Sequence, residues 1–156
     1  MTECTHKGIF VEVKGGGKLE SHRSIKMTGG KHEILPIMRP TDQADLFNYA
    51  YKNGFDFVAI PYAVRKKDIQ TVRDYLGPAG AHIKLLAKID TLEAIHNFED
   101  LINAADGIII NRVEIGLELP PEKLMLAEKW MIDRTNQEGK PVFVQSQVLE
   151  SMTSNG

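Results

Sequence analysis

The sequence predicts an α/β fold organised around a parallel β-sheet. Short apolar runs alternate with helix-like segments about four times along the chain, which is the pattern of consecutive βα units. The apolar runs contain few polar residues, and strands of this kind are typical of parallel sheets that are buried on both faces. Two architectures share these features, a doubly wound open sheet and a (β/α)8 barrel. A barrel takes about 250 residues, so a chain of 156 residues holds about half of one, and length alone favours the open sheet.

The amino-terminal part is predicted to be separate from this pattern. Residues 8–13 are typical of a strand, residues 14–18 form a glycine-rich turn, and residues 19–31 are polar with several basic side chains. This tract lacks the helical periodicity that follows it. We therefore divide the chain into a first unit over residues 1–33 and a second unit over residues 34–156.

The second unit is expected to begin with a helix, a strand and another helix. Thr41 is a suitable N-cap for a helix that ends before Gly54, because apolar residues recur on one face between them. Residues 55–60 form a mostly apolar run, as expected of a strand, and Pro61 ends it. Residues 67–76 then carry an apolar stripe of helical spacing, and the Gly-Pro pair that follows is a typical stop signal.

The same alternation continues to the end of the chain. Apolar runs predict strands at residues 83–87, 107–110 and 142–144. Periodic segments predict helices at residues 92–104 with a break near residue 98, at residues 121–138, and at or just after Ser146. The helix over 121–138 has a proline in its first turn and a glycine directly after its end, which are the residues that favour those two positions.

Composition and charge exclude several classes of function. The formal net charge is 19 − 21 = −2, which provides no electrostatic basis for binding nucleic acid or an anionic membrane. The single cysteine, Cys4, cannot form an intrachain disulfide, so a reducing compartment is expected. No apolar stretch approaches the roughly 18 residues of a membrane helix, and the first residues lack the apolar core of a signal peptide. These features predict a cytoplasmic protein without membrane contacts.

Polar side chains follow two neighbouring apolar runs, at the strand ends where α/β enzymes gather their chemistry. Lys88 and Asp90 come at the end of one run, and Glu114 follows the next. These three groups could hold an anionic substrate together with Mg²⁺, which takes few protein carboxylates and completes its octahedron with substrate oxygens and water. The simpler explanations are a lysine that extends along the rim of the sheet, and two solvated acids, one of which caps the helix expected from Leu92.

Two further polar residues stand at strand ends. Arg112 is placed either to clamp a carboxylate or phosphate, or to pair with Glu118 or Glu122 within its own loop. Ser146 is placed either to bind an anion together with nearby helix N–H groups, or to serve as an ordinary N-cap. The glycine-rich turn at residues 14–18 lacks the phosphate-loop pattern, and the five histidines show no metal-ligand spacing.

Three segments at these strand ends form ordered motifs: residues 88–91, 111–120 and 145–152. In order and separation they resemble the pyruvate kinase motifs Lys-Ile-Glu-Asn, Ala-Arg-Gly-Asp-Leu-Gly-Ile-Glu-Ile-Pro and Ala-Thr-Gln-Met-Leu-Glu-Ser-Met. The resemblance extends from about residue 15 to residue 152. It implies a partial (β/α)8 TIM barrel, roughly strands 4–7, at residues 34–156, preceded by a remnant of the β-rich lid domain at residues 1–33.

The resemblance also implies an activity. Pyruvate kinases transfer a phosphoryl group from phosphoenolpyruvate to ADP, which gives pyruvate and ATP in glycolysis, with Mg²⁺ and K⁺ as cofactors. In that role Lys88 would be the catalytic lysine, which neutralises charge on the transferring phosphoryl group and on the enolate. Asp90 and Glu114 would hold the Mg²⁺.

The remaining site residues follow from the same correspondence. The backbone at Val113 and Glu114 and the hydroxyl of Ser146 would receive the substrate carboxylate, and Arg112 would lie within the substrate-binding loop. Arg23 would take the place of a lid lysine that faces the nucleotide phosphates.

The sequence departs from the family motifs at several of these positions. Asp90 stands where the family has glutamate, Glu114 where it has aspartate, and Val113 where it has glycine. The family's opening strands, with the residues for K⁺ and much of the nucleotide site, and its last barrel strand have no counterpart here. We therefore expect little activity from this chain alone. Since half a barrel leaves strand edges exposed, we also expect a homo-oligomer or association with other subunits.

Two other functions remain open at this point. The first is a pyruvate kinase-like pseudoenzyme, or interaction module, that binds a partner without catalysis. The second is a different Mg²⁺-dependent barrel enzyme, a lyase or aldolase that acts on a keto acid. The second would use the same pair of carboxylates but would require no nucleotide.

Overall fold

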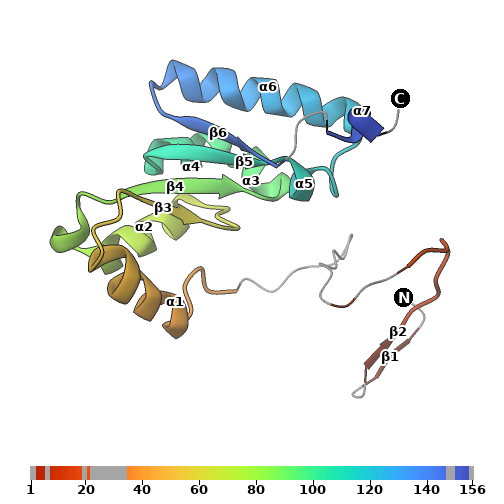
Figure 1. The fold of residues 1–156 in the computed structure, drawn as a ribbon, viewed down its shortest axis with the longest axis horizontal. Helices are drawn as coiled ribbons and strands as arrows, with labels where there is room; N and C mark the ends of the chain where they lie inside the picture. The colour runs from red at the N-terminus through yellow and green to blue at the C-terminus, as the bar shows by residue number, and fades with distance from the viewer. Residues whose placement is uncertain (1–2, 6–7, 19–20, 22–34, 147–149, 155–156) are drawn as a thin grey trace. The chain divides into compact units, whose positions relative to one another are not determined.

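The computed structural model describes residues 3–5, 8–18, 21, 35–146 and 150–154 (Figure 1). The chain divides into two compact units, Met1–Gly30 and Lys31–Gly156. The assignment of residues 1–33 to a lid remnant and of residues 34–156 to a barrel stays a prediction. No helix in the described ranges is long and apolar enough to cross a membrane.

The first unit contains a short antiparallel hairpin. Its strands are β1 (Glu3–Thr5) and β2 (Gly8–Phe10), with Glu3 opposite Phe10 and Thr5 opposite Gly8. The strand predicted over residues 8–13 is therefore shorter than expected. Strand β1 was not predicted, because three residues are too few to show an alternating pattern.

The second unit is built on a four-stranded parallel sheet. The strands are β3 (Phe57–Ile60), β4 (Lys84–Ile89), β5 (Gly107–Asn111) and β6 (Val142–Gln145), and they lie in this order. The register pairs Ile60 with Ala87, Ile89 with Ile110, and Asn111 with Gln145. The carboxyl ends of all four strands therefore lie at one edge of the sheet, and the predicted α/β fold with a parallel sheet is confirmed.

Helices connect the strands. They are α1 (Pro40–Asp45), which continues as the π-helix η1 (Leu46–Tyr51), α2 (Lys66–Leu76), the 3-10 turn η2 (Pro78–Gly80), α3 (Leu92–His96), α4 (Phe98–Ala104), α5 (Arg112–Ile115), α6 (Pro121–Gln137) and α7 (Ser151–Ser154). The predicted break near residue 98 is confirmed, since Asn97 separates α3 from α4. The single turn α5 was not predicted.

The start of α1 differs from the prediction. The helix begins at Pro40, and the residue before it is Arg39. The backbone N–H of Arg39 donates to the Asp42 carboxylate at 2.9 Å, and its guanidinium lies 3.0 Å from the same group. Thr41 is therefore inside the first turn, and the expected N-cap at this residue is wrong.

The two faces of the sheet are covered to different degrees. Successive side chains along a strand point to opposite faces. The covered face packs against the helices and holds the fully buried residues Leu85, Ala87, Ile89, Ile108 and Ile110. The open face holds Phe57, Lys88, Ile109 and Phe143, with Phe57 54% and Phe143 49% exposed. The predicted burial on both faces therefore holds for Leu86 of the central strand β4, which is 6% exposed on the open face, but not for Phe57 and Phe143 of the outer strands β3 and β6.

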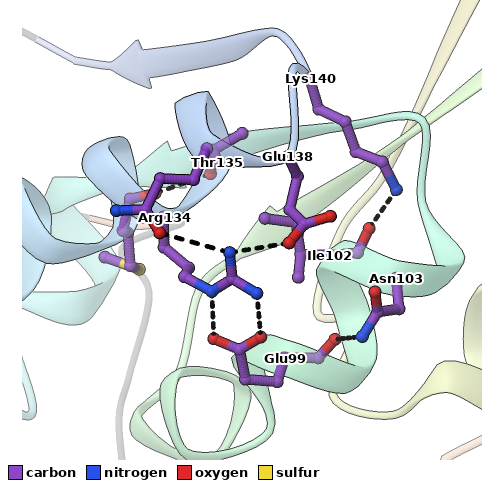
Figure 2. Close-up of polar contacts among 9 residues, drawn as sticks. Glu99, Ile102, Asn103, Arg134, Thr135, Glu138 and Lys140 are labelled. Carbon is purple, nitrogen blue, oxygen red and sulfur yellow. Dashed lines mark hydrogen bonds and ion pairs between the residues drawn. The ribbon is translucent and has the colours of Figure 1, made fainter.

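Polar contacts hold helix α6 against α4 on the covered face (Figure 2). The Arg134 guanidinium forms a bidentate ion pair with the Glu99 carboxylate, with Nε 2.8 Å from Oε1 and Nη2 3.0 Å from Oε2. After α6 ends, Lys140 donates to the carbonyl oxygens of Ile102 and Ala105 at the end of α4. Those carbonyls have no partner within their own helix, so the ammonium group stabilises the helix end.

Candidate active site at the carboxyl edge of the sheet

Lys88 and Asp90 lie side by side at the carboxyl end of β4. The Lys88 Nζ atom is 3.8 Å from the Asp90 Oδ1 atom. The Lys88 side chain is 22% exposed, and the Asp90 side chain is 1% exposed. An ammonium group in this position is both held by a buried carboxylate and accessible from the open face. It can therefore contact an anion that binds at this edge.

The Asp90 carboxylate joins the ends of three neighbouring strands. The Asn111 side-chain amide at the end of β5 donates to Asp90 Oδ1 at 2.5 Å. The backbone N–H of Tyr62, two residues after β3, donates to Asp90 Oδ2 at 2.8 Å. The helix that follows is capped by Thr91, whose hydroxyl accepts from the Ala94 N–H at 3.1 Å. Asp90 is thus neither a solvated loop acid nor the N-cap of this helix.

Tyr62 is a residue of this edge that sequence reasoning missed. Its backbone has φ of 53°, a left-handed conformation that side-chain-bearing residues adopt rarely and mainly where the surroundings enforce it. Partial burial raises the pKa of the Tyr62 phenol above 10.0, and the carboxylates of Glu114 and Asp90 raise this pKa further by repelling the phenolate. The phenol therefore remains a neutral hydrogen-bond donor in neutral solution, with both acids close to it.

The turn α5 presents the next group of predicted residues. Arg112 forms an ion pair with Glu128 of α6, with Nε 2.9 Å from Oε2, and both side chains are mostly buried. Val113 is 58% exposed and has helical backbone angles, so its β-branched side chain causes no left-handed strain. Glu114 is partly exposed. Helix α6 thus supplies an acidic partner for Arg112 that loop spacing alone did not indicate.

Ser146 follows β6 directly and is exposed. Because Gln145 pairs with Asn111, Ser146 lies at the same edge as Arg112. Its φ is 88°, which makes it the second non-glycine residue at this edge with a left-handed backbone. Both unusual conformations occur within two residues of a strand end, at an edge where such strain often accompanies a binding site.

An apolar cavity of about 450 Å³ lies elsewhere in this unit. Residues of α1, η1, β3 and α2 line it, among them Leu46, Ala50, Val58 and Val72, together with Ile37 from the segment before α1. None of the predicted site residues contributes to its wall. The cavity is therefore distinct from the polar edge described above.

A family model described as the barrel domain of pyruvate kinase matches residues 1–156. The chain belongs to the pyruvate kinase family. Among its relatives, pyruvate kinase of Eimeria tenella is 35% identical over 155 residues, which is 99% of this chain and 29% of that protein. Pyruvate kinase PKLR of Homo sapiens is 36% identical over 146 residues, which is 94% of this chain and 25% of that protein.

Solved structures lead to the same family. Cryptosporidium parvum pyruvate kinase in complex with ADP superimposes with a TM-score of 0.69 at 36% sequence identity. The match covers 76% of this chain and 25% of that chain. The fold is therefore that of a pyruvate kinase barrel domain in part, and the chain spans between a quarter and a third of the length of these relatives.

Most of the residues predicted from the pyruvate kinase motifs fall at one edge of the sheet. They are Lys88, Asp90, Arg112, Val113, Glu114 and Ser146. Arg23 lies outside the described residues, so its role stays a prediction. Sequence reasoning missed Tyr62, Asn111 and Glu128. The first two stand beside recognised strand ends and could have been found from that position, whereas Glu128 lies on a helix.

The two carboxylates differ in how well they suit a metal ion. Among the described residues, no group of three or more His, Cys, Asp or Glu side chains could hold a metal. Magnesium often needs only one or two protein carboxylates, so a smaller set is compatible with it. Glu114 is partly exposed and fits this role. Asp90 is nearly inaccessible, and each of its oxygens already accepts a hydrogen bond, so it fits poorly.

Proposed function

We propose that this chain binds phosphoenolpyruvate at the carboxyl edge of its sheet and takes part in phosphoryl transfer from phosphoenolpyruvate to ADP. The observation that carries the proposal is the Lys88 ammonium group, fixed 3.8 Å from Asp90 among the ends of four parallel strands. Membership in the pyruvate kinase family supports the substrate assignment. The corresponding metabolic role is a step of glycolysis in the cytoplasm.

Lys88 is the residue that would face the transferring group. An ammonium group is a compact cation with three donors, which suits a phosphoryl group whose charge is spread over several oxygens. As the enolate of pyruvate forms, the same cation would stabilise its negative charge. The neighbouring Asp90 lies 3.8 Å from the ammonium group and limits the rotamers that the lysine can adopt.

The carboxylate of phosphoenolpyruvate would bind next to this lysine. The backbone N–H groups of Val113 and Glu114 lie in the first turn of α5, where N–H groups lack partners within the helix. The Ser146 hydroxyl stands at the adjacent strand end. Arg112, held by Glu128, would position this loop and add positive charge.

The cations and the nucleotide complete the proposal. Mg²⁺ would be held by Glu114 and would supply charge neutralisation for the substrate oxygens, whereas Asp90, the second predicted carboxylate, is already engaged by Tyr62 and Asn111. K⁺ is the second cation of this chemistry, although most residues for it were not found in the sequence. Arg23 would contact the phosphates of ADP.

Calorimetric titration of phosphoenolpyruvate into the purified chain tests the proposal. We expect Lys88→Met to weaken binding about 10- to 100-fold, which corresponds to losing one charge-assisted contact. Lys88→Arg should retain part of the affinity. Lys84→Met, at an exposed lysine of the same strand, is the matched control and should leave binding unchanged. Equal affinities for the wild type and Lys88→Met would contradict the proposed site.

A second candidate is a pseudoenzyme that binds the same anion without catalysis. The full engagement of Asp90 in protein hydrogen bonds favours it, because this carboxylate is then poorly placed to coordinate a cation. A pyruvate-detecting coupled assay with Mg²⁺, K⁺ and ADP separates the two functions. Turnover that disappears in Lys88→Met indicates the enzyme, whereas binding without turnover indicates the pseudoenzyme.

A further inference from the structure

Two departures from the family motifs meet each other in this structure. Asp90 replaces the glutamate of Lys-Ile-Glu-Asn, and Asn111 replaces the alanine that opens Ala-Arg-Gly-Asp. The register pairs Ile89 with Ile110, so the next residues on the two strands, Asp90 and Asn111, are neighbours. One side chain has become shorter by a methylene and the other longer by a carboxamide. The two changes are therefore complementary in size as well as adjacent.

The two new side chains are also bonded. Asn111 Nδ2 donates to Asp90 Oδ1 at 2.5 Å, and Asn111 is 5% exposed. An alanine at position 111 has no donor to offer. The second carboxylate oxygen accepts the Tyr62 N–H at 2.8 Å and so holds that residue in its left-handed conformation. Asp90 therefore fixes residues that come from the strands on both sides of its own.

The same contacts restrict what else Asp90 can bind. Mg²⁺ demands near-ideal octahedral geometry and retains several water molecules, so its ligands must be reachable by a hydrated ion. The Asp90 side chain is 1% exposed, and its two oxygens already receive donors from different strands. Glu114 is partly exposed and lies in the turn α5, which directly follows the end of β5 at this edge of the sheet.

We propose that Asp90 is a positioning residue and that Glu114 alone is the carboxylate this site offers to a divalent cation. Asp90 joins the ends of β3 and β5 to β4 through its hydrogen bonds with Tyr62 and Asn111, and we call this set of contacts the clasp. The proposal rests on the proposed function for the identity of the site. The sequence prediction assigned the metal to both acids, whereas this proposal assigns the metal to Glu114 and a structural role to Asp90. It also explains why aspartate and asparagine occur together here.

Thermal unfolding in metal-free buffer containing EDTA tests the clasp. We expect Asn111→Ala and Asp90→Asn each to lower the midpoint by roughly 5 °C or more, because each disrupts a hydrogen bond between two buried side chains. Asn103→Ala is the matched control, since its amide donates to the Glu99 carbonyl at an exposed position. It should shift the midpoint much less. Equal shifts for Asn111→Ala and Asn103→Ala would overturn the clasp.

Titration with Mn²⁺, followed by electron paramagnetic resonance, tests the division of roles. Glu114→Gln should weaken Mn²⁺ binding at least 10-fold, whereas Asp90→Asn should change it less than about 3-fold, since only Glu114 is a ligand. Restoring the family pair with Asp90→Glu and Asn111→Ala together should tighten binding about 10-fold. Equal losses in Asp90→Asn and Glu114→Gln would refute the proposal.

The remaining outcomes are also decisive. If Asp90→Asn does not fold, the Asn111→Ala midpoint and the double variant decide in its place. If the wild type binds no Mn²⁺, the assignment of a divalent cation to Glu114 is overturned, whatever the double variant shows. Neither measurement uses phosphoenolpyruvate or ADP. A failure of the proposed function would therefore show as absent phosphoenolpyruvate binding, with the unfolding midpoints unaffected.

Discussion

The covered face and the open face of the sheet are made by the same strands but serve different purposes. On the covered face Leu85 and Ile110 are fully buried against helices. On the open face the neighbouring residues include the half-exposed Phe57 and the catalytic candidate Lys88. The comparison indicates that stability resides mainly on one face and ligand chemistry on the other. Substitutions at two adjacent residues of one strand, one on each face, can therefore test this comparison.

The largest expected effect comes from two consecutive isoleucines of β5. Ile110→Ala should lower the free energy of unfolding by about 3 kcal/mol, because it opens a cavity in the buried core. Ile109→Ala removes the same atoms from the open face, where the side chain is only partly buried, and should cost about 1 kcal/mol. Urea unfolding measures both. Equal losses would show that the open face contributes as much to stability as the covered one.

The next effect concerns the amino-terminal ends of β4 and β5. Asp106 accepts the Leu85 N–H at 2.9 Å and pairs with Arg73 of α2 at 2.9 Å. Burial alone would raise the pKa of Asp106, but the Leu85 N–H, the Arg73 guanidinium and the charge of Lys84 together hold it below 3.8. A lowered folded-state pKa means that the carboxylate stabilises the fold above the unfolded value of about 3.9 and that this contribution is lost as the pH falls further.

We therefore expect Asp106→Asn to be less stable than the wild type by about 1–2 kcal/mol at neutral pH. The difference should shrink as the pH falls below about 4, because the carboxyl group of the unfolded wild type is protonated first and that of the folded wild type at lower pH. Urea unfolding at several pH values measures this change. Asp133→Asn, at an exposed position of α6, provides the control. A gap that stays constant down to pH 3 would contradict the role assigned to the Asp106 charge.

A smaller effect is expected where α4 is held against the covered face. Lys140→Met keeps the length of the side chain but removes the donor to the Ile102 carbonyl, which Figure 2 shows, and to the Ala105 carbonyl. The expected loss is about 1 kcal/mol in the free energy of unfolding, since these carbonyls terminate a helix. Hydrogen exchange should report the loss first in α4. Uniform exchange changes throughout the sheet would instead indicate a general effect of the substitution.

The smallest effect concerns association through the open face. If a second copy covers the half-exposed Phe57 and Phe143, sedimentation should depend on protein concentration. Phe57→Ser and Phe143→Ser should then each weaken self-association several-fold, with little change in the stability of the monomer. Tyr75→Ser is a control, because this exposed aromatic residue lies on α2. Sedimentation as a monomer at all concentrations would exclude a homo-oligomer.

Apolar runs and stop signals were sufficient to predict the four parallel strands and most of the helices. They were not sufficient for the ends of the elements. Strand β4 extends through Lys88 to Ile89, because pairing with Ile109 and Ile110 of β5 outweighs the polar character of the lysine. Helix α1 begins one residue before Thr41, because the Asp42 carboxylate accepts from the backbone N–H of Arg39, a capping contact made from the third helical residue rather than from the N-cap side chain.

The site was predictable to a similar extent. Motif order located Lys88, Asp90 and Glu114, and register explains why these residues share an edge. The hydrogen-bond partners of Asp90 could not be predicted from motif order. The contact with Tyr62 requires a left-handed backbone, and the contact with Asn111 depends on which residue stands opposite in the register. Such contacts arise from tertiary structure, which periodicity does not encode.

The bond between Asp90 and Asn111 also makes the two positions interdependent. An alanine at position 111 removes a donor from a buried carboxylate oxygen, and a glutamate at position 90 presses a larger acid against an amide that is already in contact. Each residue therefore depends on the other for its effect on stability. The energetic effects of the two single substitutions should not add when both are made together.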